Sequence, residues 1–418
     1  MSVRNEHTRS SRSNHSSAYD DESVLSQITA ASDLGSKPDF TLWASLVGLD
    51  PDIQSEIPSN AAFQVIRDIQ NLSNRFPTWL TDPDSAQFKH IPETYHPLIN
   101  DLCSTLLAAK NLDPGRFHED DFWLYCAISI ILQACHHNMM LGRHDIDPSE
   151  RDMRFMIDCL LDDFCSSAED RVVRYSINQD LKLPQARFGK YNVTNTKAGG
   201  SMLVEVTNFE PYRANPETQI VATELGPEIP RHLQVVHCVV GFQGQSSGKN
   251  RAMMGLVSAI HQKRALGVPE QFTFGVFQRQ VHFLQVFAGA WQAGESKIKL
   301  YDIGTYLLSN PVDAIRFYLV FRAIEQLAGV YLEQLRQSEQ ELMSRVTANL
   351  PVVDWTPFGM ENVLGAPSEP GAAHGTALEL LPAFEQRDTY NRVLSYLESI
   401  SDSSTFLPVD LPPTPPIE

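Results

Sequence analysis

The sequence predicts a mixed α+β protein, in which a helical N-terminal region precedes a sheet-containing region and a long C-terminal helix. Apolar residues recur at helical spacing from Phe40 to about Leu141, and again from Ser149 to about Phe164. After residue 190 the chain changes to short runs that are typical of strands. A last amphipathic pattern, from Pro311 to Val346, predicts the long helix.

We expect four segments along the chain. Residues 1–37 are rich in Ser and charged residues and predict a disordered tail. Residues 38–147 predict a helical domain, and residues 148–346 predict an α/β domain that ends in the long helix. Residues 347–418 predict a mostly irregular tail with many prolines, one short helix near Thr389–Ile400 and a polyproline-like end at Pro412–Pro416.

The α/β domain is expected to begin with the helix Ser149–Phe164, which Pro148 and Ser149 start. A hairpin is expected next, with its turn at Lys197–Gly200. The expected elements are the hairpin strands Tyr191–Thr196 and Met202–Asn208, the strand His232–Gln243, the helix Gly248–Leu266, the strands Phe272–Phe277 and Val281–Phe287, and the short strand Lys297–Asp302.

The charge distribution and the cysteine content indicate which classes of function fit this sequence. The formal net charge is −18, but residues 170–302 carry 15 Lys and Arg against 10 Asp and Glu, a difference of +5. A basic module of this kind can hold a polyanion such as DNA or RNA. The six cysteines form no C-x-x-C pair, which favours reduced thiols. The first residues do not resemble a signal peptide, and the longest apolar run, Phe122–Leu132, is too short to span a bilayer. We therefore expect a cytoplasmic or nuclear protein that does not enter a membrane.

One carboxylate lies in an otherwise apolar strand. Glu205, in Met202–Asn208, could bind a divalent metal if a second acid lay on the neighbouring strand. That strand offers Asn192, the residue two along from Glu205 is Thr207, and Glu150 on the preceding helix could give a third oxygen. The alternative is that Glu205 faces solvent on an alternating strand.

A second motif lies between an expected strand and an expected helix. Gly244–Gly248 matches the G-x-S-x-G nucleophile elbow of serine hydrolases. Asp302 or Asp313, followed by His374, would complete the order of a catalytic triad. The alternative is a polar turn between strand and helix.

The order of helix 149–164, hairpin, strand, helix 248–266 and strand pair resembles the αβββαβ core of the PD-(D/E)XK nuclease superfamily. In particular, residues 148–330 look like the fungal restriction-endonuclease-like domains that carry a helical N-terminal region. In that superfamily an Asp and an E-x-K pair on adjacent strands bind Mg²⁺ and activate water, often with a Glu on the first helix. A Gln or Lys on the second helix frequently assists.

The resemblance allows two registers. In the first, Val204–Asn208 is the E-x-K strand, Asn192 takes the Asp position, and Asn215–Gln219 carries the helix Gln as Gln219. In the second, Glu205 takes the Asp position, Val239–Gln243 is the E-x-K strand, and Lys249 opens the following helix. Neither register supplies the full set of metal ligands.

The leading hypothesis is therefore a nuclease-like protein that binds nucleic acid, with metal-dependent phosphodiester cleavage impaired or lost. Lys190, Lys197, Lys249 and Arg251 are the candidate contacts to nucleic acid. An active Mg²⁺-dependent nuclease, with Glu150, Glu205 and Gln219 around one metal, is the enzyme alternative. A non-catalytic protein-interaction module, using helix 311–346 or the proline-rich C-terminus, is the third hypothesis, and the serine hydrolase remains a further one.

Overall fold

The computed structural model describes residue 34 and residues 37–118, 122–142, 149–166, 172–188, 191–216, 218–219, 230–242, 245–280, 282–292, 297–348, 350 and 355. These residues belong to one compact unit that spans Met1–Glu361. The expectations for the N-terminal tail, the helix near Thr389–Ile400 and the polyproline-like end fall outside the described residues, apart from Leu34 and Trp355.

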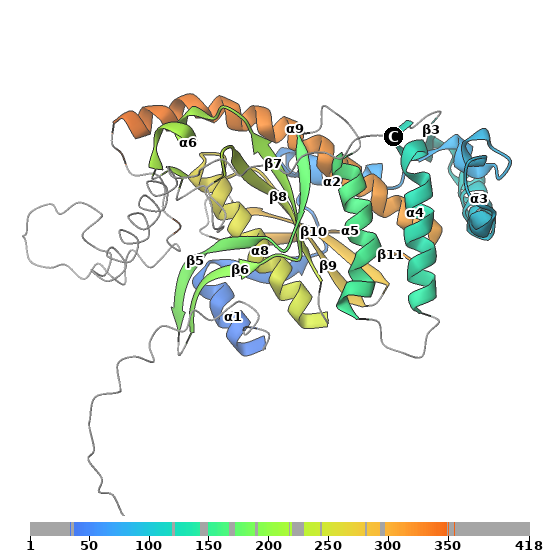
Figure 1. Ribbon diagram of the computed structural model, residues 1–418, viewed down its shortest axis with the longest axis horizontal. Coiled ribbons are helices and arrows are strands. Elements are labelled where there is room, and N and C mark those ends of the chain that lie inside the picture. The colour runs from blue at the N-terminus through green and yellow to red at the C-terminus, as the bar shows by residue number, and fades with distance from the viewer. Residues whose placement is uncertain are drawn as a thin grey trace, which may run out of the picture. The chain divides into compact units, whose positions relative to one another are not determined.

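The architecture is mixed α+β, built around a large mixed sheet with a long C-terminal helix (Figure 1). Seven strands lie in the order β1-β11-β10-β9-β8-β7-β4. Their bounds are β1 Leu49–Gln54, β4 Val173–Ile177, β7 Gly200–Val206, β8 Leu233–Gly241, β9 Thr273–Gln280, β10 Phe283–Trp291 and β11 Ile298–Leu307. The strands β8 and β9 are parallel, as are β1 and β11, and all other neighbours are antiparallel.

The strands from the edge strand β4 to β9 follow helix α5 in the chain. Helix α5 (Glu150–Ser166) is followed by β4, β7 and β8, and helix α8 (Gln245–Ala265) then connects β8 to its parallel neighbour β9. A parallel pair needs such a crossover, because the chain must return to the starting edge before the next strand begins. The helices α5 and α8 and the strands β7, β8 and β9 occur where the sequence predicts them.

The predicted hairpin is wrong. Strand β6 (Tyr191–Lys197) pairs with β5 (Asp180–Phe188) in a separate two-stranded sheet, whereas β7 pairs with β4. Two backbone hydrogen bonds, Asn178 N–H to Gly199 O and Ala198 N–H to Gln179 O, join the two pairings into one long ribbon. Asn178 has a φ of 56°, in the left-handed region, at the junction. The base of the ribbon lies in the main sheet, and its β5–β6 arm packs against α8.

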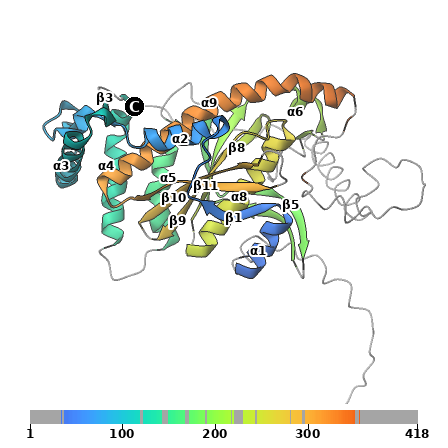
Figure 2. The same cartoon turned by 180° about the vertical axis from the view of Figure 1, so that it is seen from behind.

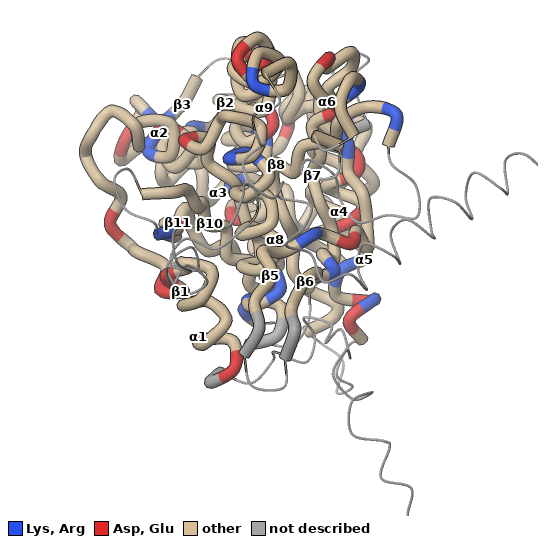
Figure 3. Tube along the Cα trace, turned by 90° about the vertical axis from the view of Figure 1, so that its left-hand side faces the viewer, with Lys and Arg blue, Asp and Glu red and all other residues tan. Residues whose placement is uncertain are grey.

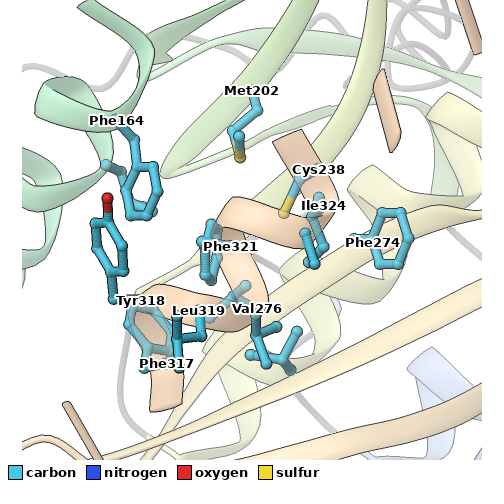
Figure 4. Close-up of a cluster of buried hydrophobic side chains, with 14 of the residues drawn as sticks. Phe164, Met202, Cys238, Phe274, Val276, Phe317, Tyr318, Leu319, Phe321 and Ile324 are labelled. Atoms are coloured by element: carbon cyan, nitrogen blue, oxygen red, sulfur yellow. The ribbon is translucent and has the colours of Figure 1, made fainter. Parts of the chain in front are cut away.

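Helices cover both faces of the sheet. On one face, α8, the arm and helix α1 (Lys37–Leu46) share a cluster of buried side chains. On the other face lie α5 and the long helix α9 (Pro311–Thr347), as Figures 1 and 2 show. The rings of Phe164 on α5 and Tyr318 on α9 are stacked with centroids 4.4 Å apart. Figure 4 shows Met202, Cys238 and Val276 of three strands beside this aromatic group.

The start of helix α9 is marked by a capping residue and a proline. The side chain of Asn310 accepts hydrogen bonds from the backbone N–H groups of Val312 and Asp313, and Pro311 occupies the first helical position. Its apolar face packs on α2, α3, α4 and β11 of its own chain. The apolar face of α9 is therefore covered by its own chain, and the expectation that helix 311–346 binds a partner stays a prediction.

The N-terminal region is mainly helical, as predicted, apart from β1 and the short strand pair β2–β3. The strand β1 adds to the sheet edge beside β11, a long-range pairing that its sequence Leu-Asp-Pro-Asp-Ile-Gln does not predict. The helices are α2 Gln64–Leu72, α3 His96–Leu112 and α4 Phe122–Leu141, with a short α6 Glu210–Ala214 further along. Short 3₁₀ turns occur at Ala61–Phe63, Thr78–Thr81, Ala86–Phe88, Glu93–Tyr95 and Pro114–Arg116, and a two-stranded pair joins β2 Phe76–Pro77 to β3 Phe117–His118.

Helix α4 extends the apolar run Phe122–Leu132 to Leu141. At 20 residues it is, by length and composition, the one described helix that could cross a membrane. The apolar run Phe122–Leu132 is part of this longer helix, and the expectation that the protein does not enter a membrane stays a prediction. In the structure α4 packs against α5 and α9, and 44% of its most apolar window is buried inside the protein.

Candidate functional site

Glu205 lies near the C-terminal end of β7, and its side chain is exposed. Its neighbour on β8 is Gln234, and on the other side its N–H donates to the carbonyl of Val172 at 3.3 Å. The six other positions of this strand are buried, so Glu205 is its solvent-facing exception. This is the alternative interpretation of Glu205 that the alternating sequence left open.

The first nuclease register is wrong. Asn192 lies on β6 and is paired with Arg187 on β5, so its strand is not next to β7 in the sheet. The register assumed that consecutive strands form a hairpin. Here the chain forms the longer ribbon, in which β4 takes the place beside β7.

The second register is also wrong, although its two strands are neighbours. Val239 and Val240 on β8 face Ser201 and Gly200 on β7, whereas Glu205 faces Gln234 at the other end of the pair. The five residue steps from Gly200 to Glu205 separate the two places by about 17 Å, because a strand rises about 3.4 Å per residue. Glu205 therefore does not lie beside the expected E-x-K strand segment.

The expected metal ligands do not come together. Glu150 begins α5, and one turn later Arg154 donates to the carbonyl of Gly199, which precedes the start of β7. Glu150 is therefore near the start of β7, and Glu205 is near its end. Among the residues that the structure describes, no group of three or more His, Cys, Asp or Glu could hold a metal. Glu150 and Glu205 therefore do not meet at one Mg²⁺ site.

The other expected site residues are spread over the molecule. Thr207 is exposed in the turn after β7, and Lys197 is exposed on the arm, paired with Asp180. The N–H of Gln219 donates to the carbonyl of Asn215. Lys249 and Arg251 are half-buried in the first turns of α8, and Lys190 lies outside the described residues.

The end of β8 where the chain runs into α8 holds a different group of polar residues, which the sequence did not reveal. We call it the β8–α8 end. Asp158 receives hydrogen bonds from Arg154 Nε at 2.7 Å and from the hydroxyl of Tyr175 at 2.6 Å. Arg154 Nη2 donates to Gly199 O at 2.8 Å, and its guanidinium lies 5.2 Å from the ring centroid of Phe242. The Arg154–Asp158 spacing of four on a helix was visible in the sequence, but the strand that carries Tyr175 was not predicted.

Burial raises the pKa of Tyr175 well above its ordinary value, and the neighbouring carboxylate of Asp158 raises it further. Tyr175 therefore remains a hydrogen-bond donor at physiological pH. Both oxygens of Asp158 are occupied by donors within the protein. The hydrogen bonds of Arg154, Asp158 and Tyr175 therefore join α5 to β4 and to the start of β7, and we call these three residues the clamp.

Close backbone packing fills the rest of this end. A Cβ added to Gly241, at the end of β8, would lie 2.2 Å from the carbonyl oxygen of Gly248 on α8. A Cβ on Gly200 would lie 1.9 Å from the hydroxyl of Tyr175. The backbone of α8 leaves no room for a side chain at Gly241, and the Tyr175 side chain occupies the space beside Gly200.

The triad of a serine hydrolase is not assembled by the described residues. The strand-to-helix order around Gly244–Gly248 is as predicted, since β8 leads into α8. Asp302 on β11 pairs with Phe287 on β10, which pairs with Gly275 on β9, and Gly275 pairs with Val239 on β8. Three strand spacings of about 4.8 Å therefore separate Asp302 from Val239, a distance of about 14 Å. The carboxylate of Asp302 accepts a hydrogen bond from Gln285.

Asp313, the other candidate acid, accepts from the N–H of Leu307 and from Arg316. Asp313 lies in the first turn of α9, which directly follows β11 in the chain, and β11 is three strands away from β8 in the sheet. His374 and Gly244 lie outside the described residues. Residues 245–248 already belong to α8, and the hydrolase interpretation of this motif stays a prediction.

The sequence matches no family model, and no curated protein matches it. A relationship to the PD-(D/E)XK superfamily therefore depends on the connectivity of the sheet and on the residues at the β8–α8 end.

Proposed function

We propose that the chain is a nuclease-derived module that keeps the αβββαβ fold of the PD-(D/E)XK superfamily and binds nucleic acid without cleaving it. The observation that carries the proposal is the order α5-β4-β7-β8-α8-β9, with β4, β7 and β8 antiparallel in turn and β9 parallel to β8. The β5–β6 arm is then an extension of the hairpin between the first two core strands.

In this correspondence, β7 and β8 take the places of the strands that carry the Asp and the E-x-K pair. The strand that carries E-x-K leads directly into the second core helix, as β8 leads into α8. The start of α5 reaches the same end through Arg154, as the first helix of the superfamily does with its Glu.

Loss of cleavage is inferred from the residues at this end. The paired positions on β7 and β8 are Gly200, Ser201, Val239 and Val240, none of which can supply a carboxylate or a lysine. Metal-dependent hydrolysis needs anionic oxygen ligands and a group that positions the water. The carboxylate that does lie there, Asp158, is held by Arg154 and Tyr175. An active nuclease using Glu150, Glu205 and Gln219 is disfavoured, because Glu150 on α5 is near the start of β7 whereas Glu205 is near the end of β7.

Binding of nucleic acid is inferred from the basic groups around the same end. Lys249 and Arg251 lie in the first turns of α8, where the helix dipole adds to their attraction for a phosphate. Figure 3 shows Lys and Arg segments near α5, α8 and β5, interspersed with acidic ones. A cytoplasmic or nuclear location, where DNA or RNA is present, is part of the proposal.

The test is fluorescence anisotropy with labelled single-stranded DNA, duplex DNA and single-stranded RNA. For four phosphate contacts to a single strand, affinity is expected to fall roughly 50-fold between about 50 and 200 mM salt. Lys249→Ala combined with Arg251→Ala should weaken binding, whereas Lys89→Ala, an exposed charge on the N-terminal region, should not. No cleavage is expected with Mg²⁺ or Mn²⁺. Binding that ignores salt, or cleavage that Glu205→Ala abolishes, would contradict the proposal.

A second candidate is a protein-interaction module. It is favoured by two large apolar side chains on the outer surfaces of α4 and α5, Phe122 at 60% exposure and Phe155 at 55%. If none of the nucleic acids binds and Phe155→Ser changes the concentration dependence of self-association in sedimentation, this second function replaces the first.

A further inference from the structure

A cluster of aromatic and cationic side chains lies where the β5–β6 arm, α8 and the end of β10 meet. We call Lys182, His261, Arg264 and Trp291 the cage. Trp355, which follows α9 in the chain, occupies it and is only 4% exposed. The Lys182 ammonium lies 5.1 Å from the ring centroid of Trp355, and the His261 ring lies 6.0 Å from it with the planes 31° apart.

The remaining contacts fix the geometry of His261. Its ring meets Trp291 edge-on at 5.0 Å, and the Arg264 guanidinium lies 4.8 Å from the Trp291 centroid. Arg264 Nη2 is 3.2 Å from His261 Nδ1. A guanidinium can only donate, so Nδ1 must accept and the proton of the neutral imidazole must be on Nε2. Burial and the charge of Arg264 lower the pKa of His261 well below its ordinary value, so the ring stays neutral.

The Nε2–H group of His261 is therefore a donor, and it is buried without a hydrogen-bond partner among the described residues. The occupant of the cage cannot satisfy it, because the indole of Trp355 has a donor and no acceptor. An unsatisfied buried donor is costly and calls for an explanation. A planar ring that carried an acceptor atom at its edge would fill the same space and remove this cost.

We propose that the cage is a binding site for one unpaired nucleobase of a single-stranded nucleic acid, and that Trp355 occupies it in the unbound protein. A nucleobase stacks on aromatic rings and carries acceptor atoms in its plane for His261 Nε2–H. Lys182 and Arg264 are close enough to favour the attached phosphates. The inference rests on the proposed function, and it adds the kind of nucleic acid and a residue that competes with it.

The first experiment compares Trp355→Ala with Trp355→Phe by anisotropy, using a labelled oligothymidylate. Trp355→Ala empties the cage and should tighten binding about fivefold or more, in line with the stacking of one base. Trp355→Phe keeps an aromatic ring in place and should bind as the unmodified chain does. Adding Trp291→Leu to Trp355→Ala should remove the gain. Unchanged affinity in a folded Trp355→Ala protein would overturn the proposal, with folding checked by circular dichroism.

The second experiment uses the unmodified sequence, in case Trp355→Ala does not fold. The chain has five tryptophans, which can be labelled with 5-fluorotryptophan and assigned by single Trp→Phe substitutions. On addition of oligothymidylate, the ¹⁹F resonance of Trp355 should acquire the solvent isotope shift of an exposed ring, while that of buried Trp79 should not. A Trp355 resonance that stays protected at saturation would contradict the proposal.

The outcomes separate the two proposals. If salt-dependent binding persists and depends on Lys249 and Arg251, but neither Trp355 experiment responds, the cage proposal fails and the nucleic-acid function stands. If no nucleic acid binds to any variant, both fail. If the Trp355→Ala protein binds N-acetyltyrosinamide more tightly than adenosine monophosphate, the cage accepts an aromatic side chain, and the nucleobase assignment is wrong.

Discussion

The ammonium group of Lys263 lies 5.1 Å from the ring centroid of Tyr331, buried between α8 and α9. Its Nζ donates a hydrogen bond to the carbonyl of Phe272, and the hydroxyl of Tyr331 accepts one from the N–H of the same residue. Burial lowers the pKa of Lys263 from 10.5 to about 7. The interior of this protein therefore holds an amine that loses its proton near physiological pH, which has a measurable consequence.

We predict that Lys263 makes folding more favourable as pH rises. Between pH 7 and 10.5 the unfolded chain keeps the Lys263 proton and the folded chain has lost it. Stability rises with pH wherever the unfolded state binds more protons, by at most about 1.4 kcal/mol per pH unit for one group. Below pH 7 both states are charged and the cost of burial is largest.

The measurement is urea unfolding of the wild type and of Lys263→Met at pH 7 and at pH 8.5. The difference in unfolding free energy between the two proteins should shift in favour of the wild type as pH rises. The comparison cancels the titration of other groups. An equal difference at both pH values would mean that Lys263 stays charged in the folded protein.

A second prediction concerns acid stability. His237 donates from Nε2 to the carbonyl of Ile324 at 2.8 Å, and burial, together with the charge of Lys263, lowers its pKa from 6.5 to about 3. Between pH 6.5 and 3 the unfolded chain binds a proton that the folded chain does not, so stability falls as pH falls. His237→Asn should reduce the loss of unfolding free energy between pH 6.5 and 4.5. His96→Gln, which replaces an exposed histidine, should leave it unchanged.

The elements that the sequence predicted well are those with strong local signals. Helix α9 has a Pro at its first position and an Asn cap, and α5 and α8 have long periodic patterns. The strands β7 and β8 are mostly apolar because most of their residues are buried on both faces of the sheet. In each case, neighbours in the sequence are enough to determine the local structure.

The ribbon and β1 could not be predicted in the same way. Strand β5 contains Lys182, Pro184 and Arg187, which oppose a strand assignment, and it forms because its partner β6 and helix α8 pack against it. The surroundings of Glu205 could not be predicted for the same reason. Glu205 stood out because it is a carboxylate in an apolar run, but which residues face it depends on pairings that span tens of residues.

A third prediction tests the clamp at the β8–α8 end. Tyr175→Phe removes the hydroxyl that donates to Asp158, and leaves a carboxylate oxygen of a mostly buried ion pair without that donor. We expect a loss of about 1–3 kcal/mol in unfolding free energy. Glu210→Gln, which breaks the exposed pair with Arg213, should cost less than about 0.5 kcal/mol. Chemical denaturation of Tyr175→Phe, of Asp158→Asn and of the double variant measures the coupling between Tyr175 and Asp158, and Glu210→Gln is the control.

The last prediction uses two glycines of opposite environment. A Cβ on Gly241 would lie 2.2 Å from the carbonyl oxygen of Gly248, so Gly241→Ala forces β8 and α8 apart and should cost about 3 kcal/mol. A Cβ on Gly329, within α9, meets nothing within 4 Å, so Gly329→Ala should stabilise the protein by up to about 1 kcal/mol. Thermal and urea unfolding of both variants give the comparison. A Gly241→Ala protein as stable as the wild type would show that β8 and α8 are not in close contact, and that a larger side chain fits at the end of β8. The inference that cleavage is lost would then be weakened, because it depends partly on this end being filled.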